Sequence, residues 1–185
     1  MKVLGIAGSL RPGSFNRKLL LAAARAVPRA IRLELWDGLD DLPAYAEQID
    51  GDRPPPGVQA LREAIDAADA VLIATPEYNA SIPGALKNAL DGASRPYPDN
   101  ALKGKPTAVV GASTGPFGAV WAQADLRRVL KTIGARVVDT DMPIGSAHHA
   151  FDETGQIRDP AQRKRLADII RELIDLAGRQ AARAA

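Results

Sequence analysis

Three short runs of almost uninterrupted apolar residues constrain the fold of this chain more than any other feature. They cover Val3–Ala7, Ala70–Ala74 and Pro106–Gly111, and each stops at a loop of small and polar residues. Strands that are apolar on both faces are typical of parallel sheets, because helices cover such sheets on both sides. A helical pattern follows each run, so the sequence predicts an α/β fold with a parallel sheet between two layers of helices.

The other segments fit the same alternation of strands and helices. Ile31–Trp36 alternates apolar and polar residues, which predicts a half-exposed strand near a sheet edge, and Arg136–Asp139 predicts a short fifth strand. Asp37–Gly57 is irregular and is expected to be a long surface loop. With no repeat or linker, one domain is predicted over residues 1–185, fraying after Gly178. The predicted helices cover Asn16–Val27, Val58–Ala68, Pro83–Ala93, Ala119–Ile133 and Pro160–Ala177.

Composition excludes several classes of function. The 24 basic and 22 acidic residues leave a net charge of +2, which favours neither nucleic acid nor a membrane surface as a partner. The absence of cysteine excludes disulfides, thiolate catalysis and Cys-ligated metals, and no His or carboxylate pattern indicates another metal site. The first apolar run is too short for a signal peptide, and none approaches the ~18 residues of a membrane span, so we expect a cytoplasmic protein.

The loop after the first apolar run has the residues of an anion site. A strand that passes through a Gly/Ser/Arg loop into a helix presents unpaired backbone N–H groups at the positive end of the helix dipole. Ser9, Ser14 and Asn16 add neutral hydrogen-bond donors, and Arg11 adds a planar cation suited to phosphate. The sequence therefore predicts a phosphate-binding loop.

Two common nucleotide motifs do not fit this loop. Gly5, Gly8 and Gly13 have the wrong spacing for the dinucleotide fingerprint G-x-G-x-x-G. Gly8 and Gly13 have the spacing of a Walker A loop, but Ser14 stands where that motif requires lysine. A terminal phosphate monoester is therefore a better ligand than a triphosphate.

Two further loops of similar composition follow the third and fourth strands. With Ser9–Asn16, the loops Thr75–Ile82 and Ala112–Gly118 would meet at one site in a flavodoxin-like strand order. No nucleophile–base pair is evident, since His148 and His149 are adjacent in a predicted loop where side chains usually face solvent. A ligand site with few acid–base residues indicates that a cofactor carries the chemistry.

Three segments of the sequence resemble the signatures of NAD(P)H-dependent FMN reductases, the flavodoxin-like group that includes quinone, azo-dye and chromate reductases. These segments are GSLRPGSFN, TPEYNASIPGALKNALDGASRP and GASTGPFGAVWAQADLRRVL, and the resemblance covers roughly Lys2–Ala177. It implies a flavodoxin-like three-layer sandwich with a five-stranded parallel sheet in the order 2-1-3-4-5. It also implies bound FMN, NADPH or NADH as a transient hydride donor, and a small-molecule electron acceptor such as a quinone, azo compound or free flavin. Turnover would follow a ping-pong mechanism without a catalytic side chain, in a homodimer or homotetramer.

The resemblance also assigns site residues. The phosphate and ribityl chain of FMN would be held by Ser9, Arg11, Ser14, Phe15 and Asn16. The turn beside the isoalloxazine ring would be formed by Pro76, Glu77, Tyr78 and Asn79, with Ser113 and Gly115 at the other edge of the ring.

Some positions bear on substrate choice and on assembly. Gly92 stands where relatives often have Trp, and Phe117 is bulkier than expected in the third loop, so both are expected to affect substrate preference. Asp37–Gly57 and Ala119–Ile133 are the candidate subunit interface, with Trp121 on the second of them.

Two other functions remain open from the sequence: a flavodoxin-type electron carrier without its own turnover, and a nucleotide-binding regulatory protein. Flavodoxins tend to be strongly acidic, whereas this chain has a net charge of +2, which favours the enzyme.

Overall fold

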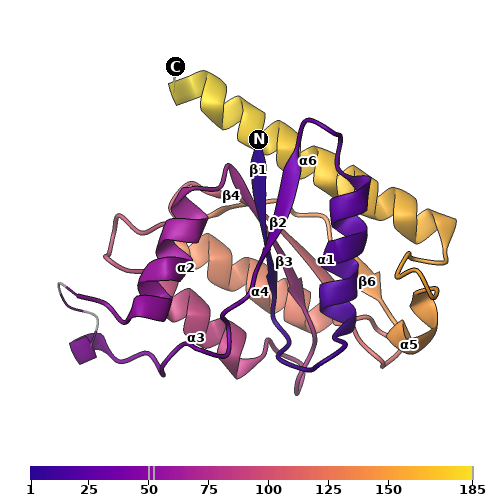
Figure 1. The fold of residues 1–185 in the computed structure, drawn as a ribbon, viewed down its shortest axis with the longest axis horizontal. Coiled ribbons are helices and arrows are strands. Elements are labelled where there is room, and N and C mark those ends of the chain that lie inside the picture. Colours follow the sequence, from indigo (N-terminus) through magenta and orange to yellow (C-terminus); the bar gives the residue numbers. More distant parts are fainter. Residues whose placement is uncertain (50, 52, 185) are drawn as a thin grey trace.

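A computed structural model describes residues 1–49, 51 and 53–184 of the chain (Figure 1). In chain order its elements are β1 (Lys2–Ala7), α1 (Phe15–Ala26), β2 (Arg32–Trp36), a 3₁₀ turn (Glu47–Ile49), α2 (Pro56–Asp66), β3 (Ala70–Thr75), α3 (Gly84–Ala93), β4 (Pro106–Ala112), α4 (Val120–Ile133), β5 (Arg136–Val137), β6 (Pro143–Ile144), α5 (Ala147–Ala150) and α6 (Pro160–Ala184).

The sheet is parallel and has the predicted order, β2-β1-β3-β4-β5. One strand is additional, because β6 also pairs in parallel with β4. Pro106 and Thr107 at the start of β4 pair with β5, whereas Gly111 and Ala112 at its end pair with β6. The fifth position of the sheet is therefore filled by two short strands, where the sequence predicted a single one over Arg136–Asp139.

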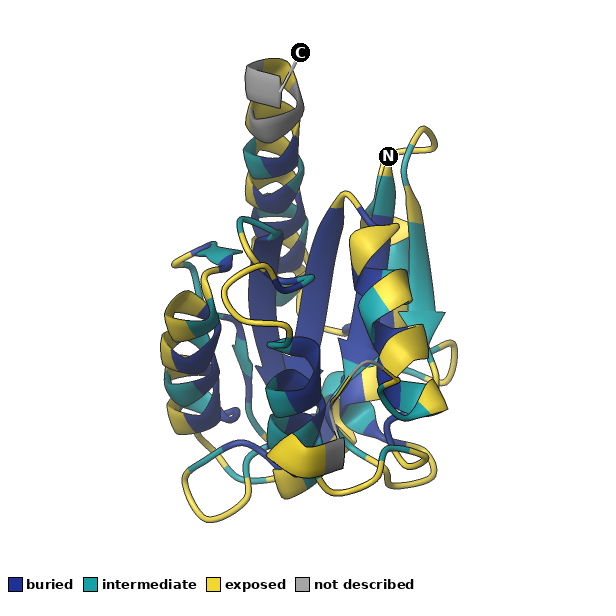
Figure 2. Ribbon diagram, turned by 90° about the vertical axis from the view of Figure 1, so that its left-hand side faces the viewer, coloured by how far each residue is buried: buried dark blue, intermediate teal, exposed yellow. Residues whose placement is uncertain are grey.

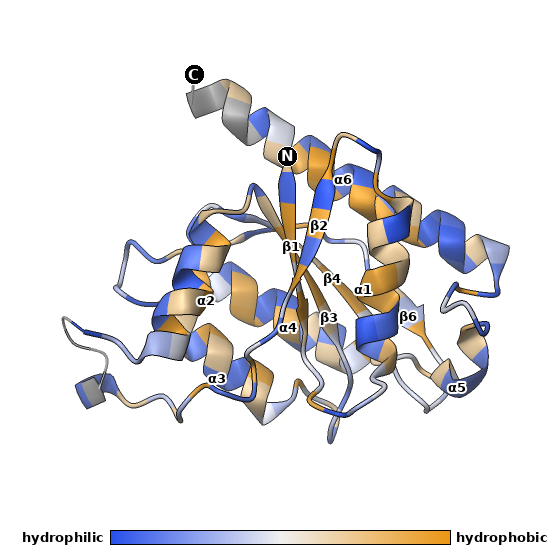
Figure 3. Ribbon diagram, in the orientation of Figure 1, coloured by the Kyte–Doolittle hydropathy of each residue, from blue (hydrophilic) through white to orange (hydrophobic). Residues whose placement is uncertain are grey.

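The two faces of the sheet carry separate hydrophobic cores. Alternate residues of the central strands point to opposite faces, as the period of a strand requires. Val3, Leu72 and Val110 pack with α1 and α6, whereas Leu4 and Ile73 pack with α2, α3 and α4. Figure 2 shows the buried sheet between helices that are exposed only on their outer sides, and Figure 3 shows hydrophobic residues along β3 and β4. The predicted flavodoxin-like three-layer sandwich is confirmed.

The predicted helix ends agree with the structure to within one residue except in α2 and α6, and α5 was not predicted. α2 begins at Pro56, two residues early, because proline is well suited to the first turn of a helix. His148 and His149 lie in α5, where the sequence predicted a loop. α6 continues through Gly178 to Ala184, beyond the end predicted at Ala177. Within the described part of the chain, no helix combines the length and the apolar character that a membrane crossing requires.

Candidate functional site

The three predicted loops meet at the carboxyl ends of the strands, at the lower edge of the molecule in Figure 1. They enclose a cavity of about 230 Å³. Its lining contains nine of the eleven predicted site residues: Ser9, Arg11, Ser14, Phe15, Asn16, Pro76, Glu77, Tyr78 and Ser113. Ala112 and Thr114 also line the cavity, whereas Asn79 and Gly115 are outside its lining.

The first loop has the geometry of a phosphate cradle. Ser14 is the N-cap of α1, and its Oγ accepts a hydrogen bond from the N–H of Arg17 at 3.4 Å. The Ser14 N–H donates to the carbonyl of Arg11 at 3.1 Å, and Gly13 between them has a φ of +70°, which glycine adopts without strain. The loop is therefore folded tightly over the positive end of α1.

Positive charge gathers around Phe15 in this cradle. The Arg11 guanidinium carbon lies 4.9 Å from the centroid of the Phe15 ring, and the Lys18 ammonium lies 5.4 Å from it. The Phe15 ring also stacks on the ring of Phe151, at a centroid distance of 6.2 Å. A phosphate in the cavity would thus meet Arg11 directly, with a second cation nearby.

Asn16 ties the cradle to the third loop. Its Nδ2 donates to the carbonyl of Ala112 at 2.9 Å, and the Ala112 N–H donates to its Oδ1 at 2.9 Å. Although Asn16 lines the cavity, both ends of its amide are engaged in this link. We therefore expect it to act at the site by holding two loops together.

Two carboxylates clamp the second loop to α4. Glu77 Oε2 accepts hydrogen bonds from the N–H groups of Trp121 and Ala122, both at 3.0 Å. The N-cap residue of α4, Ala119, has no side-chain oxygen, so Glu77 caps this helix from another loop. The second carboxylate belongs to α4 itself: Asp125 Oδ2 accepts a hydrogen bond of 2.6 Å from the hydroxyl of Ser81 in the second loop.

The charge of Asp125 is stabilised by its partners. The hydroxyl of Ser81, and after it the guanidinium of Arg128, hold the pKa of the Asp125 carboxyl below its ordinary value. The carboxyl therefore remains ionised at neutral pH and holds the second loop through a charge-assisted hydrogen bond.

A tight turn at the tip of this loop places Tyr78. The backbones of Tyr78 and Ser81 exchange two hydrogen bonds of 3.0 and 3.1 Å. Asn79 and Ala80 between them have φ values of 51° and 60°, so both adopt the left-handed conformation. Tyr78 lines the cavity and remains 51% exposed, whereas Asn79 is carried to the outer tip of the turn.

The third loop rests on a support that the sequence analysis missed. The Ser113 N–H donates to the carbonyl of Ile144 in β6, and the Ser113 carbonyl accepts from Ala147 in α5, both at 3.0 Å. A Cβ on Gly145 would lie 2.2 Å from the carbonyl oxygen of Pro116, so the backbones touch here. The sequence feature that could have indicated this support is the apolar series Met142, Ile144 and Ala147, all of which are buried in the structure.

Two exposed aromatic residues lie next to the site but outside its lining. Phe117 is 61% exposed and Trp121 is 49% exposed, and their rings make an edge-to-face contact at 5.1 Å. Paired exposed aromatic residues are typical of protein interfaces. The interface expected on Asp37–Gly57 and Ala119–Ile133 stays a prediction.

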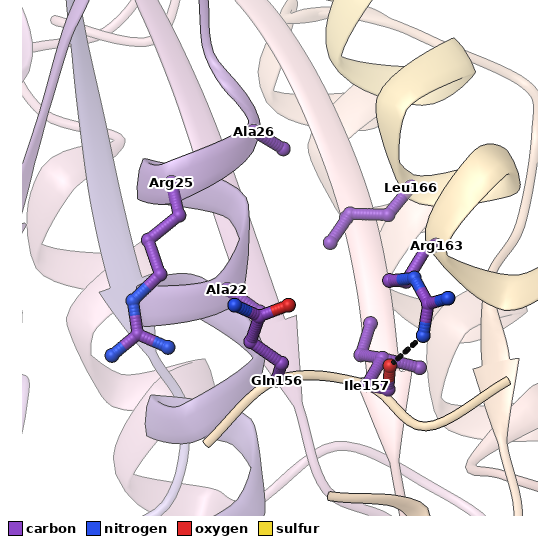
Figure 4. A pocket seen from close by; sticks show the side chains of 7 residues that line it. All are labelled: Ala22, Arg25, Ala26, Gln156, Ile157, Arg163 and Leu166. Atoms are coloured by element: carbon purple, nitrogen blue, oxygen red, sulfur yellow. Dashed lines mark hydrogen bonds between the residues drawn. The ribbon is translucent and has the colours of Figure 1, made fainter. Parts of the chain in front are cut away.

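A separate cavity lies between α1 and α6 (Figure 4). Two arginines line it, and both donate to backbone carbonyls of the segment before α6: Arg25 to Thr154 at 2.8 Å and Arg163 to Ile157 at 2.6 Å. None of its lining residues comes from the three loops of the site. We interpret it as a packing gap whose arginines fasten that segment to the helices.

Comparison with known proteins gives the family. The family model described as NADPH-dependent FMN reductase matches residues 1–149. The chain is 46% identical over 165 residues to an NAD(P)H-dependent FMN reductase of Pseudomonas aeruginosa, covering 89% of this chain and 88% of that protein. It is 41% identical over 162 residues to a quinone reductase of Pseudomonas putida, covering 83% of each protein.

A solved structure agrees with this result. The flavoenzyme NAD(P)H:(acceptor) oxidoreductase FerB of Paracoccus denitrificans superimposes with a TM-score of 0.85 at 36% identity, over 96% of this chain and 97% of that one. The resemblance carried by the three sequence segments is confirmed, and with it the class of enzyme and the use of FMN and NAD(P)H. By its sequence, its fold and the matches to both, this chain belongs to the family of NADPH-dependent FMN reductases.

Proposed function

We propose that this protein transfers a hydride from NAD(P)H, through FMN bound at the three loops, to a quinone or a similar small acceptor by a ping-pong mechanism. The observation that carries the proposal is the cavity itself. It has a phosphate cradle formed by Ser9, Arg11 and Ser14 and, from a second loop, a tyrosine that remains half exposed.

The residues present fit FMN. Serine hydroxyls, the Arg11 guanidinium and the N-terminal end of α1 are donors suited to a phosphate monoester. The second and third loops, at the ends of β3 and β4, provide further walls for the ribityl chain and ring. When bound, FMN supplies the hydride chemistry, which no pair of protein side chains needs to perform.

The protein's contribution is binding, orientation and electrostatics. The titratable side chains among the residues that line the cavity are Arg11, Glu77 and Tyr78. Glu77 is fixed on the N-terminus of α4, so its charge is balanced by backbone N–H groups and the helix dipole. Such a carboxylate holds the second loop in place.

The opening beside Tyr78 supports the ping-pong order. A donor and an acceptor that both approach through this half-exposed side would occupy it in turn, the oxidised nicotinamide leaving before the acceptor binds. A quinone is favoured as the acceptor because a flat, mostly apolar molecule matches a wall that contains Tyr78.

Anaerobic rapid mixing tests the proposal. The FMN-loaded protein is mixed with NADH or NADPH alone, and the flavin absorbance is followed. We expect bleaching without an acceptor, recovery when a benzoquinone is added, and parallel double-reciprocal plots when both substrates are varied. Intersecting plots would refute the ping-pong order. Failure to bleach with either nucleotide would favour a flavodoxin-type electron carrier instead.

A further inference from the structure

A second cavity adjoins the one just described, on the far side of the phosphate cradle. It lies at the carboxyl ends of β1 and β2 and has a volume of about 260 Å³. The two cavities share three lining residues, Ser9, Arg11 and Ser14, so the cradle forms a common wall. A ligand in the second cavity would therefore lie against the same residues that face a phosphate in the first.

The cradle side of the second cavity is basic. Arg11 lines both cavities, and Arg17, in the first turn of α1, lines the second. The Arg17 guanidinium forms two hydrogen bonds with the Asp37 carboxylate, one of them 3.2 Å between Nη2 and Oδ2. Because an arginine has five N–H donors, Arg17 retains donors for a phosphate while it holds Asp37 in position.

The opposite side of the second cavity is formed by the residues that end and follow β2. Trp36 is the last residue of β2 and contributes an aromatic wall. Asp37 and Asp40 follow it and contribute carboxylates. Gly38 keeps this wall compact, since a Cβ there would lie 3.0 Å from the Trp36 ring.

These groups match the parts of an adenosine diphosphate. Arginines suit a pyrophosphate, an indole ring provides a stacking surface for a purine, and carboxylates accept hydrogen bonds from ribose hydroxyls. In dinucleotide-binding α/β sheets, an acidic residue after the second strand performs this last role. Here Asp37 stands directly after the second strand.

We propose that this second cavity binds the adenosine end of an adenine dinucleotide. Arg11 and Arg17 would face the phosphates, Asp37 and Asp40 the ribose, and Trp36 the base. The proposal rests on the proposed function, in that a flavin phosphate occupies the cradle from the first cavity. The same adenosine could belong to the hydride donor NAD(P)H or to FAD bound in place of FMN, and the experiment separates the two.

Two titrations test the site. ADP-ribose, which contains the adenosine and both phosphates but no nicotinamide, is titrated into FMN-loaded protein by calorimetry. The apoprotein is titrated with FMN and with FAD by flavin fluorescence. One ADP-ribose per chain with a Kd below about 1 mM would assign the cavity to the hydride donor. FAD binding at least about tenfold tighter than FMN would assign it to the flavin. If neither is seen, the proposal is wrong.

Variants locate the binding. Asp40 is exposed and lines the second cavity, whereas its exposed neighbour Asp41 does not. We expect Asp40→Trp to fill the cavity. It should weaken ADP-ribose binding, or lower the affinity for FAD relative to FMN, by about tenfold or more. The affinity for FMN itself should not change. Asp41→Trp is the matched control and should change neither. Equal effects of both variants would overturn the assignment.

The outcome is separable from that of the proposed function. If the protein binds FMN and NAD(P)H bleaches the flavin, but ADP-ribose does not bind and FAD is not preferred, only the assignment of the second cavity is wrong. A protein that fails to bind FMN fails the proposed function itself.

Discussion

Asn16 and Ala112 form a closed pair of hydrogen bonds, each 2.9 Å long, between a side-chain amide and a backbone. The two residues are 96 positions apart in the sequence and both are buried. The pair joins the first turn of α1 to the end of β4, so it fixes the phosphate cradle relative to the third loop.

We expect Asn16→Ala to destabilise the protein and to weaken FMN binding. Ala112 would be left with a buried N–H and a buried carbonyl without their partner, at about 1–3 kcal/mol for each group. Urea unfolding measures the stability, and fluorescence titration measures the FMN affinity.

Asn88 offers a matched control for this substitution. It also bridges two backbone groups, accepting from the Tyr45 N–H at 2.7 Å and donating to the Pro43 carbonyl at 2.8 Å, but it does not line the cavity. Asn88→Ala should lower stability and leave FMN affinity unchanged. Equal loss of FMN affinity in both variants would show that the effect of Asn16 is general destabilisation.

Arg11→Ala is expected to weaken FMN binding with little effect on folding. Arg11 is exposed, and a charge-assisted hydrogen bond to phosphate contributes about 1.5–3 kcal/mol. Flavin titration measures the change, with Arg29→Ala, an exposed arginine outside the cavity lining, as the control. Unchanged affinity in Arg11→Ala would remove this residue from the site.

Glu77→Ala should destabilise the N-terminus of α4 together with the second loop. Loss of a helix cap costs about 0.5–2 kcal/mol. Glu77→Gln retains an acceptor oxygen without the charge and should cost less. Glu63→Ala is the control, because it removes a hydrogen bond between exposed side chains on α2. It should change the free energy of unfolding by less than about 0.5 kcal/mol. If Glu77→Ala lowers the free energy of unfolding by no more than Glu63→Ala does, the Glu77 cap does not stabilise the fold.

The clamp at Asp125 should weaken in acid. Its pKa is lowered in the folded state, first by Ser81 and then by Arg128, so the folded state binds the proton less readily than the unfolded state. The stabilisation is complete above the ordinary aspartate pKa of about 3.9 and is lost as the pH falls through the lower, folded value.

Asp125→Asn gives the test of this pH dependence. The difference in unfolding free energy between the natural protein and Asp125→Asn should be largest near neutral pH and should shrink in acid. Asp139 has its pKa lowered by Lys131 and lies outside the cavity lining, so Asp139→Asn should show a similar slope with no effect on flavin binding. A difference for Asp125→Asn that is constant from neutral pH into acid would contradict the argument.

Gly145→Ala should displace the third loop. The new Cβ would lie 2.2 Å from the Pro116 oxygen and 2.8 Å from its carbonyl carbon, and both atoms belong to backbone that cannot rotate away. We expect a lower melting temperature and weaker FMN binding. Gly84→Ala, in the first turn of α3 with no atom within 4 Å of the new Cβ, should be neutral or stabilising. Similar melting temperatures for both variants would show that the Pro116 contact is unimportant.

The sequence by itself determined the alternation of strands and helices and the two helical layers, and it predicted the phosphate cradle; the strand order followed from the family resemblance. The first three features depend on local patterns: apolar runs such as Ala70–Ala74, a serine at the start of α1, and small residues at the ends of strands. Their physical basis lies within a few residues of chain, so no partner from elsewhere needs to be known.

Only the tertiary structure decided how the loops are held and what adjoins them. Asn16 reaches Ala112, Glu77 reaches the start of α4, and Ser81 reaches Asp125, across separations of 44 to 96 residues. Such hydrogen bonds form because the packed sheet brings distant segments within reach of one another's side chains, and no local pattern specifies the partner. The same holds for the split fifth strand and for the second cavity, whose walls come from the ends of two neighbouring strands.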